Sequence, residues 1–312
     1  MRLKTKIMDI EKNIIVTGSS GFIGKNLISY LNANQNFNII NLKLDKNIDI
    51  FLPKNSDIVI HLTGKAHDLK NITDSSEYYN VNTELTKRIF DAFLLSNAKV
   101  FVILSSVKAI ADSVKEVLTE VETPNPLTHY GKSKLLAEQY ILSKSIPKDK
   151  KVYILRPCMI HGPGNKGNLN LLFNLVSKGF PWPLGQFDNS RSYLSIENLC
   201  FVINELIVRE EIQSGIYNVA DDIPLSTNDV IKLIVDTSKK KIKILNINKS
   251  IINKIAMIGD FFKLPINTDR LQKLTESYVV SNDKIKSVLG KPMPISSKEG
   301  LIRTFQSFSS DV

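Results

Sequence analysis

Tyr130 and Lys134 lie four residues apart in the stretch THYGKSK, residues 128–134. This spacing places two side chains on one face of a helix. A phenol has an ordinary pKa of about 10, so it stores a proton at neutral pH, and a nearby ammonium group favours its phenolate. The pair could therefore give a proton to a substrate oxygen, or it could be an ordinary polar pair on a helix surface.

A glycine-rich turn near the start of the chain is the second candidate for chemistry. The stretch VTGSSGFIG places Gly18, Gly21 and Gly24 three residues apart, after an apolar strand and before a helical pattern. In this context glycines permit a tight turn, close approach to a pyrophosphate and close packing of helix on strand. Oriented N–H groups at the helix start would bind the diphosphate. A purely structural glycine turn is the alternative.

Alternating strands and helices in the first half of the chain must position these residues. Strands are predicted at 13–18, 37–42, 56–64, 98–106 and 151–157, and helices at 22–33, 73–97 and 130–144. Continuous apolar strands separated by helices predict an α/β fold whose parallel sheet is covered on both faces, and right-handed crossovers make it doubly wound, of the Rossmann type. Ligands of such sheets bind beyond the carboxyl ends of the strands. The candidate positions at those ends are Gly18, Thr63-Gly64, Ser105-Ser106 and Pro157.

The second half of the chain is less regular. Residues 161–190 are rich in Gly, Pro and Asn, which predicts loops of the kind that often contact substrates. A strand is predicted at 215–220 and helices at 226–236, 249–262, 267–276 and 297–307. Without a linker, two interleaved parts are expected: a dinucleotide-binding part of residues 1–160 plus 193–220, and a smaller, mostly helical substrate-binding part of residues 161–192 plus 221–312.

The residue near the end of the second strand should choose between two dinucleotides. An acid about 20 residues beyond the glycine turn would bind the ribose 2′-hydroxyl of NAD, whereas a basic residue suits the 2′-phosphate of NADP. Lys43 lies near this position and Asp45 two residues further on. The sequence favours NADP(H) through Lys43, NAD(H) stays possible through Asp45, and an ordinary exposed lysine is the alternative to both.

Composition excludes several classes of protein. The 312 residues are 43% hydrophobic and 23% charged, enough for a large core, and the formal charge is +10. The basic residues are scattered along the chain. The segment that comes closest to a basic run, SKKKIKI at 238–244, has no accompanying aromatic motif, so nucleic-acid binding is not expected. The start has no apolar signal region and no run approaches the length of a membrane span, which predicts a cytoplasmic protein without membrane insertion.

Cysteine and histidine provide no metal site. Cys158 and Cys200 are not in a metal-ligand spacing, and a buried structural role is expected for Cys158. His61 lies within an apolar strand and should be packed. The remaining histidines, His67, His129 and His161, form no recognisable metal constellation with it.

Taken together, these motifs resemble the extended short-chain dehydrogenase/reductase family (the epimerase/dehydratase type). TGSSGFIG is similar to its TGxxGxxG, Tyr130 and Lys134 to its YxxxK, Ser106 to its hydroxyl after the central strand, and Asn82 in NVNTELT to its asparagine on the long helix. The resemblance covers nearly the whole chain. It implies Ser106, Tyr130 and Lys134 as the catalytic residues, with Tyr130 as general acid in reduction and Ser106 bonded to the same oxygen. It also implies a set of cofactor-binding residues: Gly18, Ser20, Gly21, Phe22, Ile23, Gly24, Lys43, Asp49, Ile50, Leu62, Thr63, Gly64, Asn82, Tyr130, Lys134 and Pro157.

A narrower resemblance concerns the substrate. SSVKA, RPCMIHGPGNKGN, PWPLGQFDNSRSYLSIENL and GIYNVADD look like segments of nucleotide-sugar 4-keto reductases and UDP-sugar 4-epimerases. It implies a UDP-sugar substrate bound by Ser106, Lys108, Asn168, Leu184, Arg191 and Arg270, with Arg191 on the diphosphate. Many members of the family have Ala-Ala where this chain has Thr63-Gly64, and Tyr-Gly where it has Ile110-Ala111. The second departure removes a tyrosine that often shapes the sugar pocket.

The predicted activity is reduction of the 4-keto group of a UDP-4-keto-6-deoxy-N-acetylhexosamine, with NAD(P), in surface-polysaccharide synthesis. The alternative is a UDP-sugar 4-epimerase that retains NAD, acting on UDP-glucose/galactose or on the N-acetylated pair. A non-catalytic NAD(P)-sensing protein is a remote third. A homodimer through a bundle of the helices at 73–97 and 130–144 is common in the family and is possible here.

Overall fold

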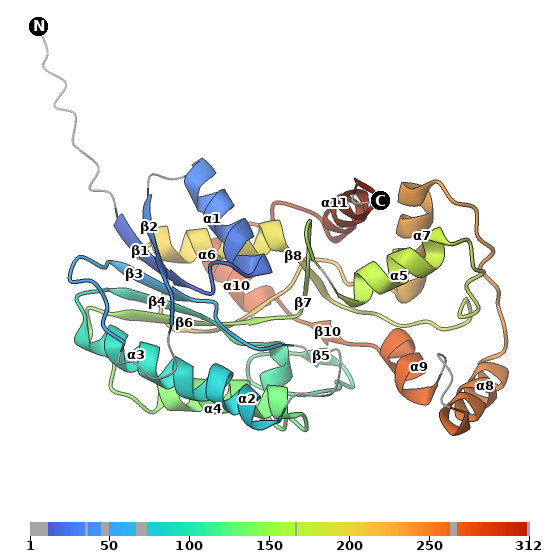
Figure 1. Cartoon of the computed structure of the whole chain (residues 1–312), viewed down its shortest axis with the longest axis horizontal. Helices are drawn as coiled ribbons and strands as arrows, with labels where there is room; N and C mark the ends of the chain where they lie inside the picture. Colours follow the sequence, from blue (N-terminus) through green and yellow to red (C-terminus); the bar gives the residue numbers. More distant parts are fainter. Residues whose placement is uncertain are drawn as a thin grey trace, which may run out of the picture.

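A six-stranded parallel sheet forms the centre of the protein (Figure 1). The computed structural model describes residues 12–34, 37–44, 50–66, 74–165, 167–262 and 267–310. In spatial order the strands are β2 (Phe37–Leu42), β1 (Lys12–Thr17), β3 (Ile58–His61), β4 (Val100–Leu104), β6 (Lys151–Pro157) and β9 (Gly215–Val219). Chain order reverses at β1, so the carboxyl end of β1 is the switch point where such sheets bind ligands. The predicted doubly wound parallel sheet is confirmed.

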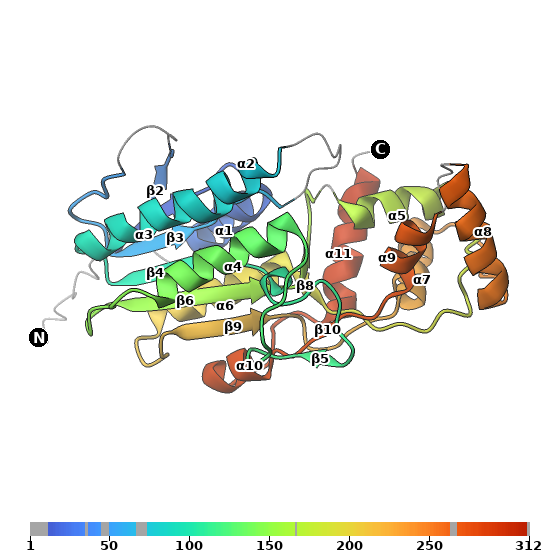
Figure 2. The ribbon, with the colours of Figure 1, turned by 90° about the horizontal axis from the view of Figure 1, so that it is seen from below.

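Helices cover both faces of this sheet because its strands are apolar on both sides. One hydrophobic cluster joins the sheet to α1 (Phe22–Asn34), α6 (Ile196–Val208) and α10 (Asp283–Leu289). A second cluster joins the opposite face to α3 (Leu85–Leu95) and α4 (His129–Leu142). Before α3, the chain forms the short α2 (Ser76–Tyr78) and a π-helical turn, η1 (Tyr79–Glu84). Figure 2 shows α3 and α4 side by side along the sheet.

The remaining helices build a lobe beyond the carboxyl ends of the strands (Figures 1 and 2). They are α5 (Asn168–Ser177), α7 (Thr227–Ser238), α8 (Lys249–Phe261), α9 (Thr268–Thr275) and α11 (Ser297–Ser310). Their apolar faces share a separate hydrophobic cluster around Trp182, Phe173 and Phe305. Two short parallel pairs link lobe and sheet: β7 (Met159–His161) with β8 (Tyr193–Ser195), and β5 (Val117–Leu118) with β10 (Val279–Val280).

Several predicted elements have different bounds. The strand predicted at 56–64 is β3, which spans Ile58–His61 only, and the strand at 98–106 is β4, which ends at Leu104. The helix predicted from residue 73 is described from Ser76, where it begins with α2 and continues through η1 into α3. The loop prediction for 161–190 was wrong at α5. Helices α6 and α10 were not predicted, and α6 was hidden because IENLCFVINELIV is apolar on nearly every face.

None of the helices within the described ranges is both long and apolar enough to cross a membrane.

Candidate active site

The glycine turn follows β1 and opens α1, as predicted. Gly18 has φ +70°, and a Cβ there would lie 2.8 Å from the Thr63 nitrogen. A Cβ on Gly24 would lie 2.4 Å from the Gly18 carbonyl oxygen, so only glycine lets helix and strand approach this closely. Gly21 donates its backbone N–H to the Gly18 carbonyl at 3.1 Å and is exposed together with Ser20. An exposed tight turn at the start of a helix fits the diphosphate of a dinucleotide.

Ser106, Tyr130 and Lys134 meet at the carboxyl end of β4. Thr128 caps α4 by accepting a hydrogen bond from Gly131 N at 3.2 Å, which places Tyr130 and Lys134 in its first two turns. The Ser106 hydroxyl lies close enough to the Tyr130 phenol to lower its pKa. Lys134 is buried, and its Nζ donates to the Leu104 carbonyl, two residues before Ser106, at 2.8 Å. The predicted spacing therefore brings all three residues to one strand end.

Asn82 holds residues 63–65 in place, and these residues lie in space between the glycine turn and Lys134. It is fully buried in η1, and its Oδ1 accepts from Lys65 N at 2.8 Å. Its Nδ2 donates to the Lys65 carbonyl and to Ser133 Oγ, both at 3.0 Å. A Cβ on Gly64 would lie 3.0 Å from Lys134 Nζ and 3.3 Å from Asn82 Oδ1. The glycine turn, residues 63–64 and Lys134 are thus in contact, and the π-helical turn there is of a kind often found at functional sites.

Burial dominates the electrostatics of the Tyr130–Lys134 pair. It raises the pKa of Tyr130, while the hydrogen bond to Ser106 lowers that pKa and Tyr78 raises it. Burial also lowers the pKa of Lys134 to about 8, opposed by the carboxylate of Glu138. The expectation that Lys134 lowers the pKa of Tyr130 is not met in this structure, because the ammonium is bonded to the Leu104 carbonyl. Tyr130 is therefore a protonated phenol at neutral pH, as a general acid must be.

A buried ion pair beneath these residues was not predicted. Glu138 follows Lys134 by one further helical turn, and its carboxylate accepts from Arg156 Nη2 at 2.5 Å and from Nε at 3.1 Å. Both side chains are at least 96% buried, and Ser105 also donates to Glu138. The network ties α4 to β4 and β6. In the sequence, the four-residue spacing of Tyr130, Lys134 and Glu138 indicated that Glu138 lies on the same helix face, but it did not indicate Arg156 as the partner.

The other predicted cofactor residues line the same edge or lie behind it. Lys43 is exposed and directly follows β2, whose last residue Leu42 pairs with Thr17 of β1. Thr63 N donates to Thr17 Oγ1 at 3.4 Å. Phe22, Ile23, Ile50 and Leu62 are half-buried against the two clusters of the sheet, and Pro157 is buried as the last residue of β6. Asp45 and Asp49 lie outside the described residues.

The predicted substrate residues are spread over several positions. Asn168 is exposed as the first residue of α5, whose N-cap is Gly167 and which has no side-chain cap. Leu184 is buried in the core of the lobe, because its side chain packs in the cluster around Trp182. Arg270 is exposed in the first turn of α9.

Lys108 and Arg191 lie close enough to interact and form the basic side of the junction between sheet and lobe. Lys108 Nζ lies 4.1 Å from the centre of the Tyr278 ring and donates to the Asp112 carbonyl at 2.6 Å. Burial lowers its pKa, Asp112 and Glu276 raise it, and Arg191 lowers it. Arg191 donates from Nη1 to the Lys273 carbonyl in α9. Tyr278 donates to the Ala111 carbonyl at 2.7 Å. A tyrosine distant in the sequence therefore packs beside Ile110-Ala111, the two residues at which this chain departs from the family pattern.

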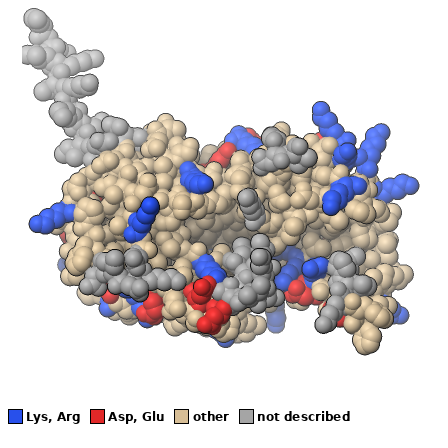
Figure 3. All heavy atoms as spheres, in the orientation of Figure 1, with Lys and Arg blue, Asp and Glu red and all other residues tan. Residues whose placement is uncertain are grey.

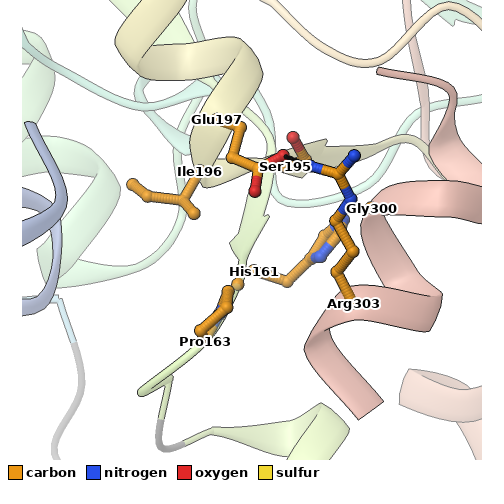
Figure 4. A pocket seen from close by; sticks show the side chains of 8 residues that line it. His161, Pro163, Ser195, Ile196, Glu197, Gly300 and Arg303 are labelled. Atoms are coloured by element: carbon orange, nitrogen blue, oxygen red, sulfur yellow. Dashed lines mark hydrogen bonds and ion pairs between the residues drawn. The ribbon is translucent and has the colours of Figure 1, made fainter. Parts of the chain in front are cut away.

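A small pocket at the base of α11 is separate from these groups (Figure 4). Arg303 makes an ion pair of 2.6 Å with Glu197 across it and one of 2.6 Å with Glu299 along its own helix. His161 beside it is buried, with Nδ1 2.9 Å from Thr304 Oγ1. The pocket contains none of Ser106, Tyr130 or Lys134, and its polar groups hold α11 against α6 and β7.

The remaining titratable groups are structural. His61 is packed as predicted: its Nδ1 lies 2.7 Å from Thr17 Oγ1 and its Nε2 3.0 Å from Thr86 Oγ1. Burial, aided by the charge of Lys134, lowers its pKa to about 3, so the ring is neutral. Burial raises the pKa of the Cys200 thiol to about 12 and that of Cys158 well above its ordinary value. No group of three metal-ligating side chains occurs in the part of the chain that the structure describes.

The chain is similar to known proteins in sequence and in fold. The chain is 28% identical to UDP-glucose 4-epimerase of Vibrio cholerae, over 95% of each chain. It is 26% identical, over 94% of each chain, to N-acetyl-alpha-D-glucosaminyl-diphospho-ditrans,octacis-undecaprenol 4-epimerase of Escherichia coli O157:H7. Among solved structures, RMD from Pseudomonas aeruginosa complexed with NADPH has a TM-score of 0.73 at 21% identity, covering 96% of this chain and 99% of that one. UDP-glucuronic acid 4-epimerase from Bacillus cereus in complex with NAD has the same TM-score at 18% identity, with the same coverage. The sequence model of the NAD dependent epimerase/dehydratase family matches residues 14–220, and the chain belongs to this family.

Proposed function

We propose that this protein catalyses NAD(P)-dependent redox chemistry at carbon 4 of the sugar of a UDP-sugar. The observation that carries the proposal is that three features lie at one edge of the sheet: the glycine turn, the buried Lys134, and Tyr130 beside Ser106. Structural packing explains each feature separately, but it does not require all three at the carboxyl edge of one sheet. A non-catalytic NAD(P)-sensing protein would have no use for Tyr130.

Each residue has a definite task in this proposal. A bound nicotinamide dinucleotide supplies or accepts the hydride. Tyr130 gives its phenolic proton to the oxygen on carbon 4 during reduction, and its phenolate takes that proton back during oxidation. Ser106 donates to the same oxygen and fixes its position. Lys134 is cationic below a pH of about 8, and its Nζ, which lies beside Gly64 and Asn82, would bind the dinucleotide.

The first candidate reaction is reduction of a UDP-4-keto-6-deoxy-N-acetylhexosamine in surface-polysaccharide synthesis. The exposed Lys43 supports it, since its position after β2, beside the end of β1, suits the 2′-phosphate of NADP. Lys43 belongs to no ion pair of the described residues. A cofactor consumed at each turnover fits a reductase.

The second candidate reaction is 4-epimerisation of a UDP-sugar with retained NAD. It is supported by the two relatives that match nearly the full length of this chain, since both are named as 4-epimerases. The same Ser106, Tyr130 and Lys134 would act in both directions of the redox step.

For the substrate, we propose that the lobe and the segments before it bind the nucleotide sugar. Lys108 and Arg191 interact with each other's charge at the junction, where two cations suit a diphosphate. This division into residues 1–160 plus 193–220 and residues 161–192 plus 221–312 stays a proposal, as do the contacts of Asn168 and Arg270. Leu184 is the weakest member because its side chain is 94% buried.

A homodimer through α3 and α4 is also proposed. Both helices expose a shared surface hollow of about 330 Å³ lined by Tyr79, Thr83, Glu84, Lys87, Leu136, Gln139, Tyr140 and Ser143. Sedimentation of wild type and Leu136→Glu would test it, and a monomeric wild type would exclude it.

One set of assays separates the two reactions. The purified protein is denatured and the released dinucleotide is identified by mass spectrometry. It is then mixed with NADPH and enzymatically made UDP-4-keto-6-deoxy-N-acetylglucosamine, while absorbance of the reduced nicotinamide is followed. Consumption of NADPH supports the reductase. Interconversion of UDP-glucose and UDP-galactose, or of their N-acetyl forms, without added cofactor supports the epimerase. Neither activity in a protein that binds dinucleotide would overturn the proposal.

A further inference from the structure

Helix α8, which spans Lys249–Phe261, is held to the protein by a narrow stripe only. Ile252, Ala256 and Gly259 are its buried residues, and they face the lobe at spacings of four and three. The helix packs mainly on α9 and lies at the far end of the lobe from the sheet (Figures 1 and 2). Most of its circumference is therefore open to the surroundings.

The open face of α8 is apolar where solvent would favour polar side chains. Ile251, Ile255 and Ile258 follow one stripe of the helix and are 53%, 45% and 54% exposed. The remaining large exposed apolar side chains of the helix and its C-cap are Met257, Phe261 and Phe262, and Phe261 is 83% exposed. Soluble surfaces rarely gather so many large apolar side chains on one element, and such patches mark contact with a protein or a membrane.

The segment that carries this face is strongly basic. From residue 239 to residue 262 the chain has six lysines and one acid, Asp260. The lysines, all exposed, are Lys239, Lys240, Lys241, Lys243, Lys249 and Lys254. Asp260 already accepts hydrogen bonds from Thr268 N at 3.1 Å and Thr268 Oγ1 at 2.6 Å, which fixes it at the start of α9. In Figure 3 basic side chains gather at the upper right, over the end of α7, while α8 lies at the lower right in Figure 1, so the two flank the same end of the lobe.

This combination of charges selects the occupant of the apolar face. If a second copy of the chain covered α8, it would bring a second set of lysines against the first, and like charges would repel. An anionic lipid surface would both cover the apolar side chains and avoid this repulsion. Its hydrocarbon boundary takes up the isoleucine and phenylalanine side chains, while its headgroups neutralise the lysines. A short amphipathic helix that carries lysines, here Lys249 and Lys254, is the ordinary form of an interfacial helix.

We propose that α8, with the lysines of residues 239–243, docks the protein peripherally on an anionic bilayer. The apolar face enters the boundary between headgroups and acyl chains by about 5–10 Å, and no segment crosses the membrane. Docking holds the lobe at the membrane surface and leaves the carboxyl edge of the sheet outside it. The inference stands on the surface of α8 alone and does not depend on the reaction.

Vesicle flotation with the full chain tests the docking. Vesicles of 30% phosphatidylglycerol in phosphatidylcholine are compared with pure phosphatidylcholine at low and at high salt. The wild type is expected to float with the anionic vesicles, less with neutral ones, and less in about 0.5 M NaCl, where charges are screened beyond about 4–5 Å. Ile255→Ser/Ile258→Ser should bind at least about tenfold more weakly, because two apolar side chains no longer leave water.

Matched controls keep the result interpretable. Leu95 is 91% exposed at the end of α3, and Leu95→Ser should float like the wild type. Lys240→Glu/Lys241→Glu should weaken binding to anionic vesicles by roughly tenfold and leave neutral vesicles unaffected. All substituted side chains are exposed, so thermal unfolding should be unchanged. Absence of flotation, or equal flotation of the α8 variant, would overturn the proposal. So would a lipid-independent dimer in sedimentation that Ile255→Ser/Ile258→Ser abolishes.

Discussion

Polar side chains at the carboxyl edge of the sheet are held very differently from those in the lobe. At the edge, Asn82, Lys134 and Glu138 are buried, and each hydrogen-bonds groups of another element. In the lobe, Asn168 and Arg270 are exposed at the first turns of their helices. The edge is thus organised before any ligand arrives, as electrostatic catalysis requires. The lobe instead offers exposed polar side chains at helix starts, where a ligand can reach them.

The largest effect should come from removing the phenol at the organised edge. Tyr130→Phe is expected to lower kcat by about 10²–10⁴-fold, because the general acid is lost while the ring still packs. Turnover is measured with the substrate identified in the assays above, together with dinucleotide binding, which should persist. Tyr78→Phe is the matched control, since Tyr78 lies edge-on to Tyr130 at 6.3 Å between ring centres. Equal losses in both variants would remove Tyr130 from the proton step.

The edge should also lose the most stability when its buried charges are separated. Arg156→Met leaves the Glu138 carboxylate buried without its guanidinium, and breaking such a pair typically costs about 3–5 kcal/mol. The free energy of unfolding is measured in urea. Asp149→Asn provides the comparison, since its exposed pair with Lys99 should contribute less than about 1 kcal/mol. Similar losses in both variants would show that Glu138–Arg156 is not energetically distinct from a surface pair.

The burial of Lys134 predicts a dependence of stability on pH. Its pKa is about 8 in the folded protein against 10.5 ordinarily, so folding disfavours the protonated form. This cost is fully present below pH 8 and disappears as the pH rises toward 10.5, since the unfolded chain binds the extra proton in that window. Relative to Lys134→Met, the wild type should gain up to about 3 kcal/mol between pH 8 and 10.5. A difference that stays constant across this window would contradict the burial.

In the lobe, a more modest and purely binding effect is expected. Arg191→Lys should raise KM for a UDP-sugar by roughly tenfold with a smaller change in kcat, because lysine cannot make the bidentate contact to phosphate. Arg303→Lys is the control, since its guanidinium binds Glu197 and Glu299 instead. A loss of kcat at constant KM would move Arg191 from substrate binding to the chemical step.

The difference between the organised edge of the sheet and the lobe also explains which features the sequence could predict. Tyr130, Lys134 and the three glycines occupy positions that regular elements fix, so spacing alone located them. The π-helical turn around Asn82 has no such signature, and the Glu138–Arg156 pair needed the contact between α4 and β6, which sequence distance hides. The exposure of Asn168 and the burial of Leu184 could not be predicted, because side-chain direction in the lobe depends on how α5, α7 and α11 pack. Local spacing carries no information on that packing.

The smallest effect tests how tightly the edge is organised around Lys134. Gly64→Ala introduces a Cβ that would lie 3.0 Å from Lys134 Nζ. The neighbour is the end of a flexible side chain, so folding should cost less than about 1 kcal/mol while Nζ shifts by a few tenths of an ångström. We expect kcat to fall only about threefold. Gly167→Ala, where a Cβ meets nothing closer than 3.6 Å, should leave kcat unchanged. A loss above about a hundredfold for Gly64→Ala would mean that the open space beside Nζ is itself required for turnover.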